Sequence, residues 1–151
     1  MGGVRTAYGK SRIGSYLTQH RPEYAVIMYG TNDSKSPQAV EAARGNLSAI
    51  IEACVRAGTV PILATIPPRG YDKSQQDDQV RFNEALVRLC RERHVPVSYC
   101  FEEMMQRNLK ELLGDCVHLT PNPGNNAAGA ALWKTFNQIE FALRDPTSTW
   151  D

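Results

Sequence analysis

The 151-residue sequence lacks any marked excess of charge, since 17 basic and 16 acidic residues leave a net charge of +1. Nucleic acids and anionic membrane surfaces attract strongly basic domains, so we expect neither as a partner. Apolar runs of about 20 residues, the length that spans a bilayer, are also absent. The glycine-rich, basic stretch of residues 2–15 has no apolar segment typical of a signal peptide, and we expect no leader there.

The four cysteines have none of the spacings that zinc sites use, so we predict no metal site. Cys54 and Cys90 fall in stretches with helical periodicity, which indicates small core residues. Cys116 is too close in sequence to His118 for its thiol to meet the ring easily, so we do not expect it to be a nucleophile. The even count permits disulfides without requiring them.

Composition and length are typical of one globular domain, residues 1–151, with 42% hydrophobic and 22% charged residues. Three apolar runs read as strands buried in a parallel sheet: 24–29, 60–66 and 95–99, the last with a proline that suits an edge. Helical periodicity marks four segments: 37–57, 75–93, 101–113 and 125–143. A short helix is expected at 13–20 after an irregular start. This alternation predicts an α/β sandwich with a parallel sheet.

The stretch Tyr24–Asp33 ends its apolar run at Gly30 and continues with Thr31-Asn32-Asp33. Ligands of open α/β sheets bind just outside the carboxyl ends of the strands, so these polar side chains are candidates for chemistry. An ordinary turn explains the stretch equally well, because Gly, Asn and Asp are common turn residues.

A second candidate lies far along the chain, in the loop of residues 114–120, where Asp115 precedes His118 by three residues. The carboxylate can accept a hydrogen bond from one ring nitrogen and leave the other free as a general base. Considered alone, the pattern also fits a surface loop with one ordinary histidine.

Together, Gly30-Thr31-Asn32-Asp33 and Asp115-x-x-His118 resemble the motifs of the SGNH hydrolases, also called GDSL-type esterases and lipases. The likeness runs from about residue 2 to residue 143, with the same order of elements. It implies a three-layer α/β/α sandwich with a flavodoxin-like parallel sheet and no cofactor. It also implies that Asn32 helps to form an oxyanion hole and that Asp115 and His118 are the acid and base of a Ser-His-Asp triad. A glycine N–H joins the family's oxyanion hole, and Gly2 or Gly3 matches it best; we assign Gly3.

One part of the family pattern is absent: no Gly-Asp-Ser, the motif that carries the nucleophile on the first strand, occurs in these 151 residues. Only about twenty residues precede the strand at 24–29, so we expect an SGNH domain whose sequence begins after its first two strands. The nucleophile would then lie on a missing or separate segment. Substitutes within the chain are Ser11, Ser15 and Ser34, although none has the strand-to-turn setting that exposes a nucleophile.

The resemblance implies ester hydrolysis through an acyl-enzyme, and we expect a small ester with a short acyl or acetyl chain. A non-catalytic SGNH-like binding or scaffold module is the alternative, which the Asp115 and His118 pair disfavours. With its neighbour absent, the strand at 24–29 would end the sheet and offer an apolar edge. We therefore expect pairing with a second copy or with a separate N-terminal segment, and no stable, active monomer. Asn83 is expected to serve packing or capping.

Overall fold

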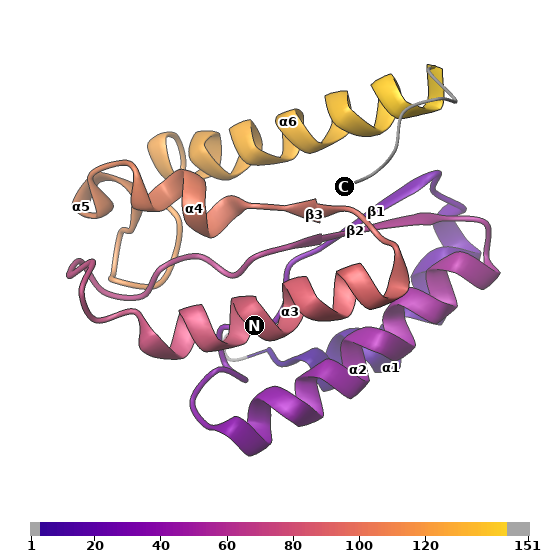
Figure 1. Ribbon diagram of the computed structural model, residues 1–151, viewed down its shortest axis with the longest axis horizontal. Coiled ribbons are helices and arrows are strands. Elements are labelled where there is room, and N and C mark those ends of the chain that lie inside the picture. Colours follow the sequence, from indigo (N-terminus) through magenta and orange to yellow (C-terminus); the bar gives the residue numbers. More distant parts are fainter. Residues whose placement is uncertain (1–3, 145–151) are drawn as a thin grey trace.

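The computed structural model describes residues 4–144, which form the α/β/α sandwich that the sequence predicts (Figure 1). Three parallel strands lie in the order β1-β2-β3: β1 (Tyr24–Ile27), β2 (Val60–Ala64) and β3 (Val97–Ser98). Three helices cover one face: α1 (Thr6–His20), α2 (Pro37–Arg56) and α3 (Asp77–Arg93). Three cover the other: α4 (Cys100–Met105), α5 (Leu109–Leu112) and α6 (Pro123–Arg144).

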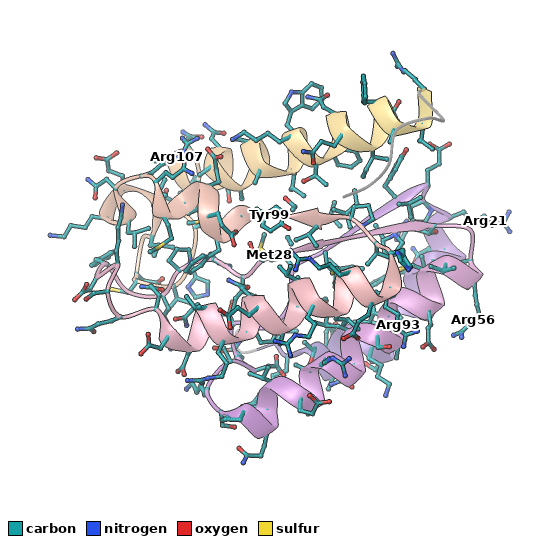
Figure 2. All side chains as sticks on the ribbon, in the orientation of Figure 1. Arg21, Met28, Arg56, Arg93, Tyr99 and Arg107 are labelled. Atoms are coloured by element: carbon teal, nitrogen blue, oxygen red, sulfur yellow. The ribbon has the colours of Figure 1, made fainter. Side chains whose placement is uncertain are left out.

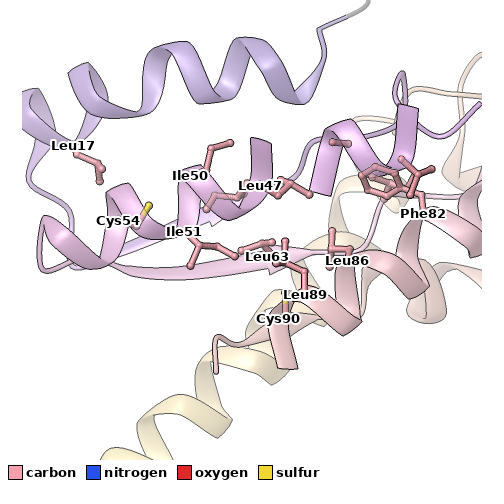
Figure 3. Packing of buried hydrophobic residues seen from close by; sticks show 14 residues of the cluster. Leu17, Leu47, Ile50, Ile51, Cys54, Leu63, Phe82, Leu86, Leu89 and Cys90 are labelled. Carbon is pink, nitrogen blue, oxygen red and sulfur yellow. The ribbon is translucent and has the colours of Figure 1, made fainter. Parts of the chain in front are cut away.

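The larger hydrophobic core fills the layer between the sheet and helices α1, α2 and α3 (Figure 3). Leu47, Ile50 and Ile51 of α2 recur at helical spacing and face the sheet, where each is at most 2% exposed. Cys54 and Cys90 lie in this core as predicted, and burial raises the pKa of the Cys90 thiol to about 12.

In the opposite layer, α6 presents small side chains to the sheet. Ala128 and Ala131 pack in one cluster with Ala64 of β2 and Cys100 of α4. Within residues 4–144, no helix is both long and apolar enough to cross a membrane.

The N-terminal segment corrects the sequence prediction, because α1 begins at Thr6 and not at Ile13. Its start is stabilised by the Asp33 carboxylate, which accepts hydrogen bonds from the Thr6 backbone N–H and hydroxyl, both at 3.1 Å. A cap of this kind cannot be predicted from the local sequence, since 27 residues separate the two partners. Gly9, which suggested an irregular chain, instead lets the Tyr29 ring approach the helix, where a β-carbon would lie 2.7 Å from Tyr29 Cε2.

The strands are shorter than predicted, and the predicted helix over 101–113 is two helices. The break falls before α5, where the Asn108 side chain accepts a hydrogen bond from the Lys110 N–H and starts a new helix. At one edge, β3 is entered through Pro96, as its proline predicted.

The other edge of the described sheet is β1. The Val60 N–H donates to the Glu23 carbonyl, so alternation along the parallel ladder turns the main-chain groups of Tyr24 and Val26 away from β2. Val26 is 45% exposed, and a cavity of about 250 Å³ lies between α1 and β1 beside it. The predicted apolar edge strand is therefore present within residues 4–144.

Candidate active site

Three segments far apart in the sequence lie at the end of the molecule where the parallel strands finish: 30–33 follows β1, 65–72 follows β2, and 114–120 precedes α6. A backbone hydrogen bond of 2.7 Å from the Gly70 N–H to the Cys116 carbonyl joins the second and third. The opposite end of the molecule carries basic residues where helices end, with Arg21, Arg56 and Arg93 gathered there (Figure 2). Such cations favour helix C-termini, so that end has an ordinary structural explanation.

The turn after β1 requires glycine at its first residue. Gly30 has φ +135°, a conformation that side chains rarely adopt. A β-carbon there would also overlap the Phe82 ring of α3, which is almost fully buried. The turn therefore packs tightly against α3, and this contact fixes where the next residues, 31–33, begin.

Asp33 is buried and anchors this turn to two helices. It accepts from Thr6 at the start of α1, and Asn46 of α2 donates its amide to the same Thr6 hydroxyl at 3.1 Å. The carboxylate at a helix N-terminus is a favourable arrangement for the helix dipole. Asp33, the acidic residue of the motif, thus has a structural role that positions its neighbour, Asn32.

Asn32 is half-buried, and its Nδ2 donates one hydrogen to the Val4 carbonyl at 3.1 Å. A primary amide has two N–H donors, so this bond orients the group and leaves the second hydrogen for a ligand. Gly3, the expected second oxyanion donor, lies outside the described residues.

Asp115 and His118 meet as the sequence predicts. Asp115 Oδ2 lies 2.8 Å from His118 Nδ1, while Oδ1 accepts the backbone N–H groups of His118 at 2.8 Å and Val117 at 3.2 Å. The backbone and ring hydrogen bonds from His118 lower the pKa of Asp115 from its ordinary 3.8 to about 2. The carboxylate is ionised at any pH well above 2, so it can hold the imidazole in one tautomer with Nε2 as acceptor.

Residues 114–118, which we call the acid–base loop after the roles that the sequence predicts for Asp115 and His118, are open to solvent: the side chains of His118 and Asp115 are 78% and 62% exposed. Its tight shape uses Cys116 with φ +67°. Within residues 4–144, no hydrogen bond joins this loop to Asn32, which lies on the turn after β1 at the same edge of the sheet.

The three serines considered as substitute nucleophiles have other partners. Ser11 and Ser15 lie on α1, where their hydroxyls donate to the carbonyls of Tyr8 and Arg12. Ser34 is buried and donates to the Thr31 carbonyl. In the described part of the chain, none of the three hydrogen-bonds to His118. The same part contains no group of three His, Cys, Asp or Glu side chains that could hold a metal ion.

Sequence reasoning identified Asn83 and missed Gly70. Asn83 accepts from the Ile66 N–H at 2.8 Å and donates to the Ile66 carbonyl at 3.1 Å, which confirms its packing role and fixes the chain just after β2. Gly70 carries the link to the acid–base loop. Its only sequence signal is a glycine in a polar loop after two prolines, which does not specify a partner.

Comparisons with known proteins agree with the fold described above. The sequence model of the GDSL-like lipase/acylhydrolase family matches residues 1–122. A search of the curated proteins finds no match.

Several solved structures share the fold. The acetyl xylan esterase AlAXEase aligns with TM-score 0.77 and 20% identity over 89% of this chain and 77% of its own. A GDSL-like lipase from Bacteroides thetaiotaomicron aligns with TM-score 0.67 and 16% identity over 91% and 71%. A catalytic mutant of an acetylxylan esterase from Geobacillus stearothermophilus aligns with TM-score 0.70 and 14% identity over 90% and 67%.

Proposed function

The chain belongs to the GDSL-like lipase/acylhydrolase family of hydrolases, and from this premise we propose that it cleaves carboxylic esters with short acyl or acetyl chains. His118 is the general base, Asp115 orients it, and Asn32 stabilises the oxyanion. The observation that carries the proposal is the 2.8 Å contact between Asp115 Oδ2 and His118 Nδ1. A binding or scaffold module without chemistry has no evident need for that pair, so we do not favour it.

In the proposed reaction, a serine Oγ attacks the ester carbonyl carbon while its proton passes to His118 Nε2. The tetrahedral oxyanion accepts the free N–H of Asn32, a donor of a kind worth ~3 kcal/mol in the transition state. Collapse expels the alcohol, which takes the proton from His118. Water then enters in the same way and releases the acid from the acyl-enzyme.

The serine itself is proposed to come from outside the 151 residues, on a segment that carries Gly-Asp-Ser. The settings of Ser11, Ser15 and Ser34 support this, because each hydroxyl is already engaged away from His118. The open edge of β1 supports it too, since outward main-chain groups at Tyr24 and Val26 can pair with an added strand. Without that segment, a second copy of the chain is the proposed occupant of the edge.

A serine-directed phosphonate probe, with the labelled peptide identified by mass spectrometry, tests the source of the nucleophile. We expect no labelling of the chain alone, and labelling of the Gly-Asp-Ser serine when a segment carrying it is co-expressed. Labelling of Ser11, Ser15 or Ser34 would contradict the external nucleophile.

The substrate is tested on the reactivated protein with a panel of nitrophenyl esters from acetyl to dodecanoyl and with an acetylated xylo-oligosaccharide. The latter is included because two proteins of the same fold are acetyl xylan esterases. We expect the highest kcat/KM for the shortest acyl chains. A preference for long chains would overturn the proposed substrate class.

A further inference from the structure

The acid–base loop has few ties to the rest of the molecule. The side chains of His118 and Asp115 are mostly exposed, so packing against other residues contributes little to their positions. Among residues 4–144, the only backbone hydrogen bond from outside the segment 109–125 to residues 114–118 is the 2.7 Å bond from the Gly70 N–H to the Cys116 carbonyl. The adjoining Tyr71 side chain lies against Cys116, whose contact raises the pKa of Tyr71. The position of His118 therefore depends on where Gly70 is held.

Gly70 is held by a buried glutamine that carries no chemistry of its own. Gln76, 3% exposed, accepts the Arg69 N–H at 2.9 Å and donates to the carbonyls of Arg69 and Asp72, both at 2.8 Å. Both donors of the amide are used, and both main-chain groups of Arg69 are paired. The next N–H along the chain is that of Gly70, so the amide fixes the direction in which this donor points.

Gln76 directly precedes α3, the helix that also contacts the other half of the site. Phe82 packs against Gly30, and Asn83 pairs with Ile66. One rigid helix thus contacts the turn that carries Asn32 and, through Gln76 and Gly70, the loop that carries His118.

We propose that Gln76 is a positioning residue for His118: it holds the Arg69–Gly70 main chain so that Gly70 fixes the acid–base loop relative to Asn32. The kinetic part of this inference rests on the proposed esterase function. A base displaced by about 1 Å can lose on the order of 10²-fold in rate, so we expect loss of the amide to lower kcat by about 10- to 100-fold with little change in KM.

Gln76→Met is the test variant, because methionine has a similar shape but cannot make the hydrogen bonds of the glutamine amide. Gln75→Met is the matched control, since Gln75 is the neighbouring, exposed glutamine. Hydrogen–deuterium exchange by mass spectrometry on the full chain follows three segments: 67–73, 113–119 and, as a check on the core, 43–54. We expect faster exchange in the first two for Gln76→Met alone, with the core segment unchanged.

Unchanged exchange in 113–119 for Gln76→Met would overturn the inference, as would an equal rise in Gln75→Met. If Gln76→Met unfolds throughout, Gln76→Asn, which keeps the amide on a shorter side chain, should give the same local pattern. Faster exchange with normal kcat would also overturn the inference, because His118 would then not need the tie. The exchange result stands apart from catalysis, so a wild-type protein that stays inactive with the Gly-Asp-Ser segment added would count against the esterase proposal and not against the tie.

Discussion

The turn at residues 30–33 and the acid–base loop at 114–118 carry the two halves of the candidate site, and they are held in opposite ways. The turn is pressed against Phe82 and anchored by the buried Asp33 carboxylate. The loop is solvent-exposed and takes its shape from Asp115, which accepts the backbone N–H groups of Val117 and His118 and contacts the His118 ring.

This difference suits the roles proposed for the two halves. An oxyanion donor acts by being fixed before charge develops, and burial together with hydrogen bonds supplies that rigidity. A general base must exchange protons with substrate, leaving group and water, so an exposed ring oriented by one carboxylate suits it. From this contrast we predict that substitutions in the loop lower activity severely without affecting stability. Substitutions in the turn should lower both activity and stability.

The largest effect is expected from His118→Ala in the protein reactivated by a Gly-Asp-Ser segment. Loss of the base should lower kcat by on the order of 10⁴-fold, with the melting temperature unchanged because the ring is exposed. His94→Ala, at the exposed C-terminal cap of α3, is the control and should retain activity. Similar losses in both variants would indicate a stability effect.

Asp115→Asn should lower kcat by on the order of 10³-fold while leaving the fold intact. The remaining oxygen can still accept the backbone N–H groups, but the new amide would donate to Nδ1 and move the ring proton to Nε2, where the base must accept. Circular dichroism and ester kinetics together check this. Asp77→Asn, exposed on the first turn of α3, is the comparison, and equal kcat in the two variants would contradict the role of Asp115.

Asn32→Ala should lower kcat by roughly 10²-fold with KM nearly unchanged, because the lost donor acts on the transition state. The variant also loses its bond to the Val4 carbonyl, so a small drop in melting temperature should accompany it. Asn137→Ala on the exposed surface of α6 should change neither quantity. A defect confined to KM would mean that Asn32 binds substrate or only shapes the turn.

Gly30→Ala tests the rigidity of the turn apart from its chemistry. A methyl group there would overlap Phe82 in a backbone conformation unfavourable to alanine, so unfolding free energy should fall by about 2 to 3 kcal/mol. Gly45→Ala in α2 meets nothing within 4 Å and should stabilise by about 0.5 to 1 kcal/mol. Urea denaturation measures both, and a neutral Gly30→Ala would contradict the packing of the turn.

The sequence predicted those features that depend on local pattern or on short spacing. Apolar runs placed all three strands, and the three-residue spacing of Asp115 and His118 anticipated their contact. Asn83 was assigned to packing or capping, and its bonds to Ile66 confirm this.

Features that depend on distant partners could not be predicted. The start of α1 needs Asp33, 27 residues away, and the tie from Gly70 reaches Cys116 in a separate loop. The hydrogen bonds of Gln76 could not be predicted from the sequence either, because a glutamine before a helix is compatible with many roles. The nucleophile remains a proposal, since its motif does not occur in these 151 residues.

The central claim is that this chain supplies base and oxyanion donor to a nucleophile on another segment. Light scattering and a nitrophenyl acetate assay on the purified chain, alone and with a Gly-Asp-Ser segment, test it most directly. We predict an associated, inactive protein alone and esterase activity once the segment is added, with His118→Ala inactive in both cases. A monodisperse monomer with full activity alone would contradict the claim.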